Sequence, residues 1–236
     1  AAQVLEQLDP LYGPVAWNPR FNALDELIFT VLSQHTSDVN SGAAYRSLRA
    51  RFPSWLDVIE AGPVEVVDAI RQGGLANQKA PRIQEILRIV LERTGAFDLE
   101  FLAGLPVDEA RVWLDSLPGI GKKSTAIVLN FALGMPAMPV DTHIYRVGRR
   151  LGLVPLKASV DRAHDIMEAQ VAPEDIFRYH VLLITHGRRV CRAQRPACAD
   201  CALADVCPSA AVFERATRAP GRGRKYRRPV RGGQLL

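Results

Sequence analysis

The sequence lacks any uninterrupted apolar run of the roughly 20 residues that a membrane-spanning helix needs. Its first residues, Ala-Ala-Gln-Val-Leu-Glu-Gln-Leu, lack the basic start and the long apolar core of a secretory signal and predict an amphipathic helix. The first residue is not Met, which leaves room for an N-terminal extension. An export signal is missing and free thiols are expected, so these features predict a cytoplasmic protein.

Alternating polar and apolar residues bounded by hairpin turns, the pattern of half-buried strands, do not stand out in the sequence. Apolar residues instead recur at helical spacing between residues 24 and 32, between 83 and 91, and between 181 and 184. Proline and glycine interrupt the chain at short intervals, so the helices should be many and short. Hydrophobic residues make up 48% of the chain and charged residues 23%, as in ordinary folded proteins. We expect an all-α fold.

Cysteine is scarce, and the four cysteines of the chain are Cys191, Cys198, Cys201 and Cys207. Because they crowd into one short segment, we interpret them as ligands of one centre. A disulfide staple is one alternative, although a chain of 236 residues can bury a large core without bridges. Zinc is the other, but structural zinc sites usually pair two C-x2-C hairpins and this sequence has one. The spacing therefore favours a [4Fe-4S] cluster over zinc.

Positive charge is unevenly distributed along the chain. The formal net charge is +5, yet residues 209–236 alone contain eight Lys or Arg against one Glu. We expect residues 208–236 to form a basic, disordered tail that attracts nucleic acid, with a merely solubilising extension as the alternative. Arg192 and Arg195, in the loop after the first cysteine, are candidate phosphate contacts, although charge runs more often form a solvated surface.

Two glycines form a tight turn in the segment Leu117-Pro-Gly119-Ile120-Gly121-Lys-Lys. A helix should end near residue 116 and another should begin near residue 123, so we interpret the segment as a helix–hairpin–helix. Glycines leave the backbone bare, which lets the N–H groups of the turn approach a phosphate closely. Gly119, Ile120 and Gly121 are therefore candidate contacts with a DNA backbone. Glycines also serve as ordinary helix C-caps, which is the alternative.

A lysine and an aspartate near this turn add a chemical signal. Lys123 lies in the first turn of the expected helix, where the helix dipole and the neighbouring Lys122 disfavour a charged amine. A neutral lysine is a nucleophile, and phosphate binding by both lysines is the alternative. Asp141 directly precedes a new apolar-periodic segment, so we expect it to cap a helix N-terminus even if it also has a catalytic role.

Three motifs in this order resemble the endonuclease III family of helix–hairpin–helix glycosylases. The motifs are Leu-Pro-Gly-Ile-Gly-Lys-Lys at 117–123, Val-Asp-Thr-His-Ile-Tyr-Arg-Val at 140–147, and the C-x6-C-x2-C-x5-C pattern at 191–207. The resemblance extends from about Phe21 to Cys207. It implies two α-helical lobes, namely a six-helix barrel domain with the hairpin at 17–135 and a domain of residues 1–16 and 136–207 that carries a [4Fe-4S] cluster.

The resemblance also implies an activity, that of a base-excision repair DNA glycosylase and AP lyase removing oxidised pyrimidines such as thymine glycol. Lys123 matches the nucleophile that forms a Schiff base with the sugar before β-elimination, and Asp141 matches the essential carboxylate. Leu75 matches a residue that wedges into the duplex, with a buried helix-end leucine as the alternative. The side chain that fills the gap left by the flipped base corresponds to Gln34 or His35, and ungapped alignment places His35 there.

The implied partner is double-stranded DNA with damaged bases or abasic sites, bound by a monomer associated with the nucleoid. A cluster-containing mismatch adenine glycosylase is one alternative, but it should lack the catalytic lysine and carry a further C-terminal domain. A noncatalytic DNA-binding protein that keeps the hairpin for backbone contacts is another. The stretch from Thr94 to Pro106 looks longer than the family pattern, and we expect it to be packed structure, with a role in shaping the DNA site as the alternative.

Overall fold

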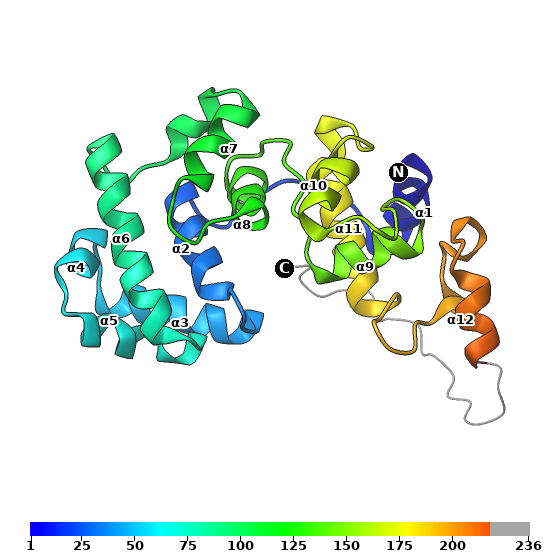
Figure 1. Cartoon of the computed structure of the whole chain (residues 1–236), viewed down its shortest axis with the longest axis horizontal. Coiled ribbons are helices and arrows are strands. Elements are labelled where there is room, and N and C mark those ends of the chain that lie inside the picture. Colours follow the sequence, from blue (N-terminus) through cyan, green and yellow to red (C-terminus); the bar gives the residue numbers. More distant parts are fainter. Residues whose placement is uncertain (218–236) are drawn as a thin grey trace. The chain divides into compact units, whose positions relative to one another are not determined.

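The computed structural model describes residues 1–217, and residues 218–236, most of the expected basic tail, lie outside this part (Figure 1). The described residues form helices and loops without a strand, which confirms the all-α prediction. None of their helices has the length and apolarity needed to span a bilayer. The chain divides into two units, one of residues 18–139 and one of residues 1–17 together with residues from 140 onward. The boundaries expected from the family resemblance differ from these by a few residues.

The unit of residues 18–139 is a bundle of short helices around one apolar core. Its elements are α2 (Ala23–Ser33), α3 (Asp38–Arg51), α4 (Trp55–Glu60), α5 (Pro63–Ile70), η1 (Arg71–Gly73), α6 (Ala76–Thr94), η2 (Glu100–Gly104), α7 (Val107–Asp115), α8 (Lys122–Ile127) and the π-helical turn η3 (Val128–Ala132). Side chains of α2 and α6 at helical spacing are fully buried, among them Leu27, Ile28, Ile83 and Leu87. Each such side chain contributes roughly 1.5–3 kcal/mol by leaving water.

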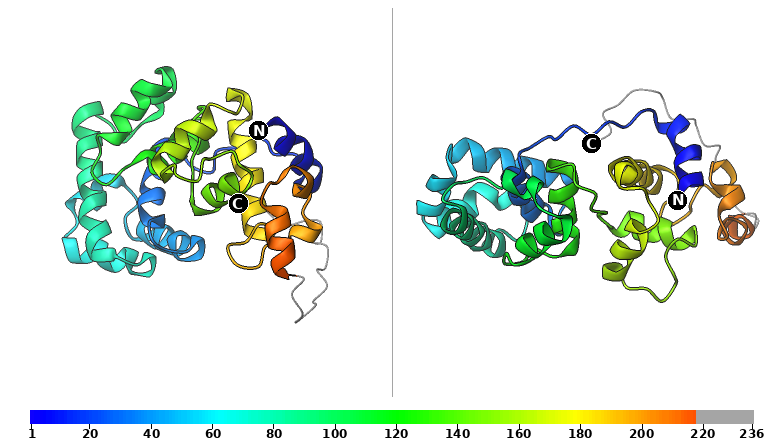
Figure 2. Two further views of the ribbon diagram at one scale, coloured as in Figure 1. Left: turned by 45° about the vertical axis from the view of Figure 1, so that its right-hand side comes forward. Right: turned by 90° about the horizontal axis from the view of Figure 1, so that it is seen from above.

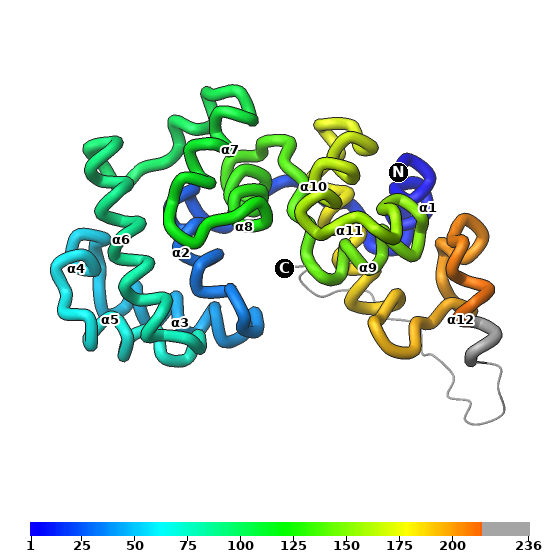
Figure 3. The backbone as a smooth tube through the Cα atoms, in the orientation of Figure 1, coloured from blue at the N-terminus to red at the C-terminus, as the bar shows by residue number. Residues whose placement is uncertain are grey.

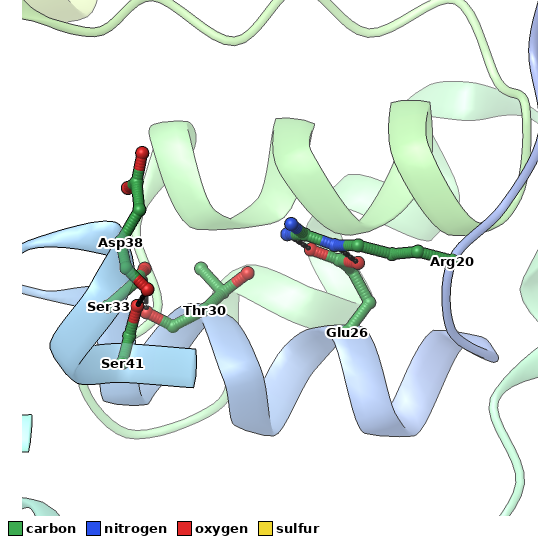
Figure 4. Close-up of polar contacts among 6 residues, drawn as sticks. All are labelled: Arg20, Glu26, Thr30, Ser33, Asp38 and Ser41. Atoms are coloured by element: carbon green, nitrogen blue, oxygen red, sulfur yellow. Dashed lines mark hydrogen bonds and ion pairs between the residues drawn. The ribbon is translucent and has the colours of Figure 1, made fainter. Parts of the chain in front are cut away.

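Polar side chains fix where the first helices of this unit begin. The Asn22 side chain accepts a hydrogen bond from the Asp25 N–H, and the Ser37 hydroxyl accepts one from the Asn40 N–H, so both act as N-caps. Within α2, the Glu26 side chain is 1% exposed and is held by Arg20, whose Nε and Nη2 lie 2.9 and 2.7 Å from the two carboxylate oxygens (Figure 4). This bidentate pair satisfies a carboxylate that would otherwise be buried alone.

The long stretch from residue 94 to residue 106 is packed structure, as expected. Leu99 and Leu102 are fully buried, and the Phe101 ring meets the Trp113 ring edge to face at 5.6 Å between centroids. The Glu100 carboxylate accepts a hydrogen bond of 2.8 Å from the Ala23 N–H, one of the N–H groups left without a partner at the start of α2. The stretch therefore closes one end of the bundle.

The second unit is built around α11. Its elements are α1 (Ala2–Tyr12), α9 (Thr142–Arg150), α10 (Val160–Glu168), η4 (Pro173–Asp175), α11 (Ile176–Arg189), η5 (Cys198–Asp200), η6 (Ala204–Val206) and α12 (Ala210–Thr217). The helices α1 and α9 both pack against α11 (Figure 2). The amphipathic helix expected at the N-terminus is confirmed as α1, which buries Val4 and Leu8. Its Asp9 carboxylate accepts from Arg178 of α11 at 2.9 Å.

The expectation of a disordered tail from residue 208 is wrong for residues 210–217, which form α12. Ala210 is buried, and α12 packs against η5, so this segment has apolar contacts that its composition did not suggest. The Arg150 guanidinium lies over the Phe213 ring, 4.4 Å from its centroid, and adds a cation–π contact. The rest of the expected tail, residues 218–236, lies outside the described residues.

Candidate active site and cysteine centre

The helix–hairpin–helix predicted from the sequence is present between α7 and α8 (Figure 3). Gly119 has a φ of 72°, a left-handed conformation that favours glycine, and Gly121 is the N-cap residue of α8. Ile120 is buried and its N–H donates to the Leu117 carbonyl at 3.2 Å, so this residue anchors the turn from inside. Gly119 and Gly121, which have no side chain to cover the backbone, are exposed on the turn. The sequence analysis proposed Gly119, Ile120 and Gly121 alike as DNA contacts. In the structure Ile120 is buried, whereas the two glycines are exposed.

Two side chains from elsewhere in the unit brace this turn. The Gln34 amide donates to the Gly119 carbonyl at 3.1 Å, and Arg82 Nη1 donates to Gln34 Oε1 at 3.2 Å. The Arg82 side chain lies so close to the Gly119 backbone that a Cβ built there would be 2.5 Å from Arg82 Nε. Glycine is therefore required at position 119 for its φ and for the space that Arg82 occupies.

Lys123 is the second residue of α8 and its side chain is exposed. In the described part of the chain its amine has no recorded hydrogen bond or ion pair, so it is sterically and chemically accessible. The residues that follow it, Ser124 and Thr125, are buried, and the Thr125 hydroxyl donates to the Asp115 carboxylate of α7. These contacts fix the start of α8 and thus the position of the lysine backbone.

Asp141 is the N-cap of α9 in the other unit, as predicted from its residue type. Its Oδ1 accepts from the Ile144 N–H at 2.7 Å, and the residue is half-buried. One carboxylate oxygen is thus engaged at the N-terminus of α9. Further along α9, Arg146 donates to the backbone carbonyls of Cys191 at 3.0 Å and Gly187 at 2.9 Å, and so ties α9 to the cysteine segment.

Positive φ marks three of the predicted DNA contacts. In residues 1–217 the non-glycine residues with φ in the left-handed region are His35 at 54°, Leu75 at 50° and Arg195 at 52°. Each costs on the order of 1–3 kcal/mol, and such strain is concentrated at functional sites. Leu75 is 47% exposed, so its alternative role as a buried helix-end leucine is wrong.

The four cysteines line one pocket of the second unit, together with His186 and apolar residues such as Val147, Leu151 and Leu203. None of them forms a disulfide in the described structure, so the disulfide alternative is wrong. Burial raises the pKa of the Cys201 thiol to about 11, and the nearness of the other three sulfurs adds to the rise. Four thiolates cannot share this pocket without a cationic core to offset their charge.

Polar groups are already directed at these sulfurs. Arg150 Nη1 lies 3.3 Å from Cys191 Sγ, and the same guanidinium donates to the carbonyls of Arg192 at 2.7 Å and Ala193 at 3.0 Å. Arg150 therefore holds the loop in which the side chains of Arg192 and Arg195 are exposed. In the described residues no hydrogen bond or ion pair is recorded for these two guanidinium groups, so they can contact a phosphate.

A buried histidine completes the surroundings of the cysteines. Burial lowers the pKa of His186 to about 4, so the ring is neutral at ordinary pH. Its Nδ1 lies 3.2 Å from the Tyr12 hydroxyl of α1 and its Nε2 lies 3.5 Å from Cys201 Sγ. In the tautomer with the proton on Nε2, the tyrosine donates to the ring and the ring donates to the sulfur. Within residues 1–217, no three His, Cys, Asp or Glu side chains are arranged to hold a single metal ion.

Sequence reasoning missed the residues that support the site. Arg82 braces the hairpin through Gln34, which was predicted as a DNA contact and not as a support, and Arg150 and His186 reach the cysteine segment, all through contacts between residues distant in sequence. No local pattern marks such residues, because an arginine or histidine on a helix is most often solvated or buried for other reasons. An alignment of homologues is the signal that could have found them.

Comparison with known proteins agrees with these features. The family model described as "HhH-GPD superfamily base excision DNA repair protein" matches residues 28–173. Endonuclease III of Escherichia coli K12 is 35% identical over 181 residues, which cover 77% of this chain and 81% of the relative. Endonuclease III of Thermotoga maritima is 34% identical over 182 residues, covering 77% of this chain and 80% of the relative.

A solved structure of a non-covalent endonuclease III–DNA complex superposes with a TM-score of 0.76 at 28% identity, covering 91% of this chain and 96% of the other. A thermostable thymine-DNA glycosylase, at 20% identity and a TM-score of 0.72, shares the fold. The chain belongs to the HhH-GPD superfamily of base excision DNA repair proteins and, within it, to the endonuclease III family.

Proposed function

We propose that the chain is a bifunctional DNA glycosylase and AP lyase of base-excision repair, with Lys123 as its nucleophile. The observation that carries the proposal is an exposed amine without a hydrogen-bond partner in the described residues, two residues after a glycine hairpin of the family type. The hairpin exposes backbone that can lie against a DNA phosphate, so it places the amine beside the sugar–phosphate backbone. In the noncatalytic alternative the same lysine would only bind a phosphate, and covalent trapping on DNA separates the two roles.

The chemistry follows from an amine and a carboxylate at a flipped nucleotide. The damaged base leaves the stack, at least cost where its pairing is already weakened. The Lys123 nitrogen forms a bond to C1′ while the bond from C1′ to the base breaks, and the base leaves with a proton. The opened sugar then carries an imine to the lysine. Loss of a C2′ proton breaks the C3′–O bond, which releases the 3′ phosphate and nicks the strand.

Asp141 is the essential carboxylate of this proposal. Its cap hydrogen bond to Ile144 uses one oxygen, which leaves the second able to accept the proton that the attacking amine loses or to stabilise positive charge on the sugar. The substrates we propose are oxidised pyrimidines such as thymine glycol in duplex DNA, and abasic sites, bound by a monomer in the cytoplasm at the nucleoid.

We propose that His35, and not Gln34, fills the gap left by the flipped base. Both polar ends of the Gln34 amide are engaged, with the Gly119 carbonyl and with Arg82, so Gln34 supports the hairpin. The His35 side chain is exposed on a strained backbone and has no recorded hydrogen bond in the described residues. Leu75, exposed on the segment that begins α6, is the residue proposed to wedge into the duplex.

We propose that the four cysteines hold a [4Fe-4S] cluster. The support is a set of four sulfurs around one pocket, without the close grouping that one ion requires, since zinc binds thiolates at about 2.3 Å. When bound, the cluster would be held by Cys191, just after α11, and by Cys198, Cys201 and Cys207, and would thereby close the loop that carries Arg192 and Arg195. Iron and acid-labile sulfide near four each per chain, with a brown colour, are expected, whereas a colourless zinc protein would exclude the cluster.

Borohydride trapping on abasic DNA tests the assignment of Lys123. The native protein should crosslink, because borohydride reduces the imine between lysine and sugar to a stable amine. Lys123→Gln should abolish the adduct, and Lys122→Gln, on the adjacent exposed residue, serves as the matched control and should retain it. An undiminished adduct in Lys123→Gln would remove this lysine from its role. On a duplex with a mismatched adenine, release of that base by the native protein without any covalent adduct would favour a mismatch adenine glycosylase.

A further inference from the structure

Lys79 of α6 is a fully buried lysine that no proposed catalytic step uses. It is 2% exposed, and its Nζ donates to the Leu32 carbonyl at 2.6 Å and to the Gly73 carbonyl at 2.8 Å. Burial lowers the pKa of this amine, because desolvation disfavours its charged form. In the described part of the chain, both recorded side-chain hydrogen bonds of Lys79 go to backbone. A long cationic side chain is rarely buried without a partner of opposite charge, so this placement calls for a reason.

The two carbonyls lie just before the two segments that carry the proposed DNA-inserting residues. Leu32 is in the last turn of α2, which ends at Ser33, and Gln34 and His35 come next along the chain. Gly73 ends η1, and Gly74 and Leu75 follow it directly. Both segments then enter left-handed backbone, at His35 and at Gly74–Leu75. One amine therefore bridges a carbonyl near the end of α2 and a carbonyl at the end of η1, each a few residues or fewer before a positive-φ residue.

The two segments also touch one another at this place. A Cβ built on Gly73 would lie 3.0 Å from Ala44 Cβ and 3.8 Å from the Leu32 carbonyl oxygen, so there is little spare room between the segments. The end of α2 presents carbonyls without helical partners, which attract a cation. The Lys79 ammonium has three N–H donors, so this one group can donate to the Leu32 carbonyl and to the Gly73 carbonyl at once.

We propose that Lys79 is a positioning residue that holds the His35 segment and the Leu75 segment at a fixed separation, so that both side chains enter the duplex together. This inference rests on the proposed glycosylase function and deepens it. Extruding a base requires a wedge and a gap-filling group to act in concert on one base pair, and a loss of register between them slows the step. Lys79 itself touches neither DNA nor the reacting atoms.

Gln84 provides a matched control on the same helix. It is 4% exposed, and its amide donates to two carbonyls, those of Val58 at 2.8 Å and Ala61 at 3.0 Å. These carbonyls belong to the end of α4, which carries no proposed DNA contact. Lys79→Met and Gln84→Met therefore remove the same number of side-chain hydrogen bonds from equally buried sites, and they differ in which segments are released.

The experiment uses the full chain and a duplex with thymine glycol and 2-aminopurine opposite the lesion. We expect Lys79→Met to slow single-turnover base removal at saturating DNA by about tenfold or more and to reduce the rise in 2-aminopurine fluorescence on binding. Crosslinking to a preformed abasic site should fall much less, because that nucleotide flips easily. Gln84→Met should resemble the native protein in all three measurements. Adding Leu75→Ala to Lys79→Met should slow base removal little further, because both act on one event.

Equal behaviour of Lys79→Met and Gln84→Met, or fully multiplicative effects of Lys79→Met and Leu75→Ala, would overturn the proposal. If Lys79→Met does not fold, Gly73→Ala takes its place, because the added methyl shifts the same segment while leaving the amine intact. It should lower base removal more than abasic-site crosslinking, and unchanged base removal would count against the proposal. A native protein inactive on both substrates would instead refute the proposed function, so the two failures are distinguishable.

Discussion

Replacing Gly119 by alanine should destabilise the unit of residues 18–139 by an amount that follows from two features of the hairpin. The first is the φ of 72°, which costs an alanine about 1–2 kcal/mol in the left-handed region. The second is the Arg82 side chain, whose Nε would lie 2.5 Å from the new Cβ and has to move away. Moving it breaks the hydrogen bond from Arg82 to Gln34, worth about 0.5–1.5 kcal/mol.

Together these effects give a loss of roughly 1.5–3.5 kcal/mol, or a fall in melting temperature of roughly 3–14 °C at about 2–4 °C per kcal/mol. Gly121→Ala is the control in the same turn, since φ at Gly121 is −129° and a Cβ there would meet nothing within 4 Å. We expect it to change the free energy of unfolding by less than about 1 kcal/mol. Urea titrations of both variants, followed by circular dichroism, measure the difference. Equal midpoints for the two variants would refute the reasoning.

Further substitutions test other contacts of the two units. Arg20→Met should cost about 2–3 kcal/mol in urea denaturation because it leaves the Glu26 carboxylate buried alone, and adding Glu26→Leu should recover much of the loss; additive costs would contradict this. The Arg178 guanidinium lowers the pKa of Asp9 below its ordinary 3.8, so their pair contributes stability above pH 3.8 that is lost as the pH falls through the folded value. Asp9→Asn should therefore flatten the acid end of the stability curve, and an unchanged acid slope would show that the pair contributes nothing. Cys201→Ser should lower the iron and sulfide content and the visible absorbance, and full iron content would remove Cys201 from the proposed ligands.

Local chemistry made much of the fold and the candidate site predictable. Short apolar runs at helical spacing gave the all-α class, the two glycines gave the hairpin, and Asp141 was expected as a helix N-cap because its own side chain makes that hydrogen bond. These features depend on residues a few positions apart. Because the residues that determine these features are neighbours in the sequence, the sequence alone was enough to predict them.

The supporting contacts could not be predicted, because they join residues that are far apart in the sequence. Lys79 meets Leu32 across 47 positions and Gln34 meets Gly119 across 85, so neither pattern is visible without the fold. The proposal that His35 and not Gln34 fills the gap in the duplex also depends on such contacts, those of Gln34 with Gly119 and Arg82. The helix at 210–217 was missed because the composition of the segment is basic, whereas Ala210 and Phe213 line the cysteine pocket together with residues from other parts of the unit.

The division of the chain into a continuous unit and a split unit has a consequence for how the protein is made. Residues 18–139 emerge from the ribosome as one uninterrupted stretch and can acquire their own core during translation. The helix α1 is synthesised before this unit. Its apolar face is covered only after α11, more than 160 residues further along the chain, has been synthesised. Cys207 emerges later still. Incorporation of an inorganic core should therefore be a late event in maturation, and nascent chains stalled before residue 176 should carry a finished hairpin and an exposed α1.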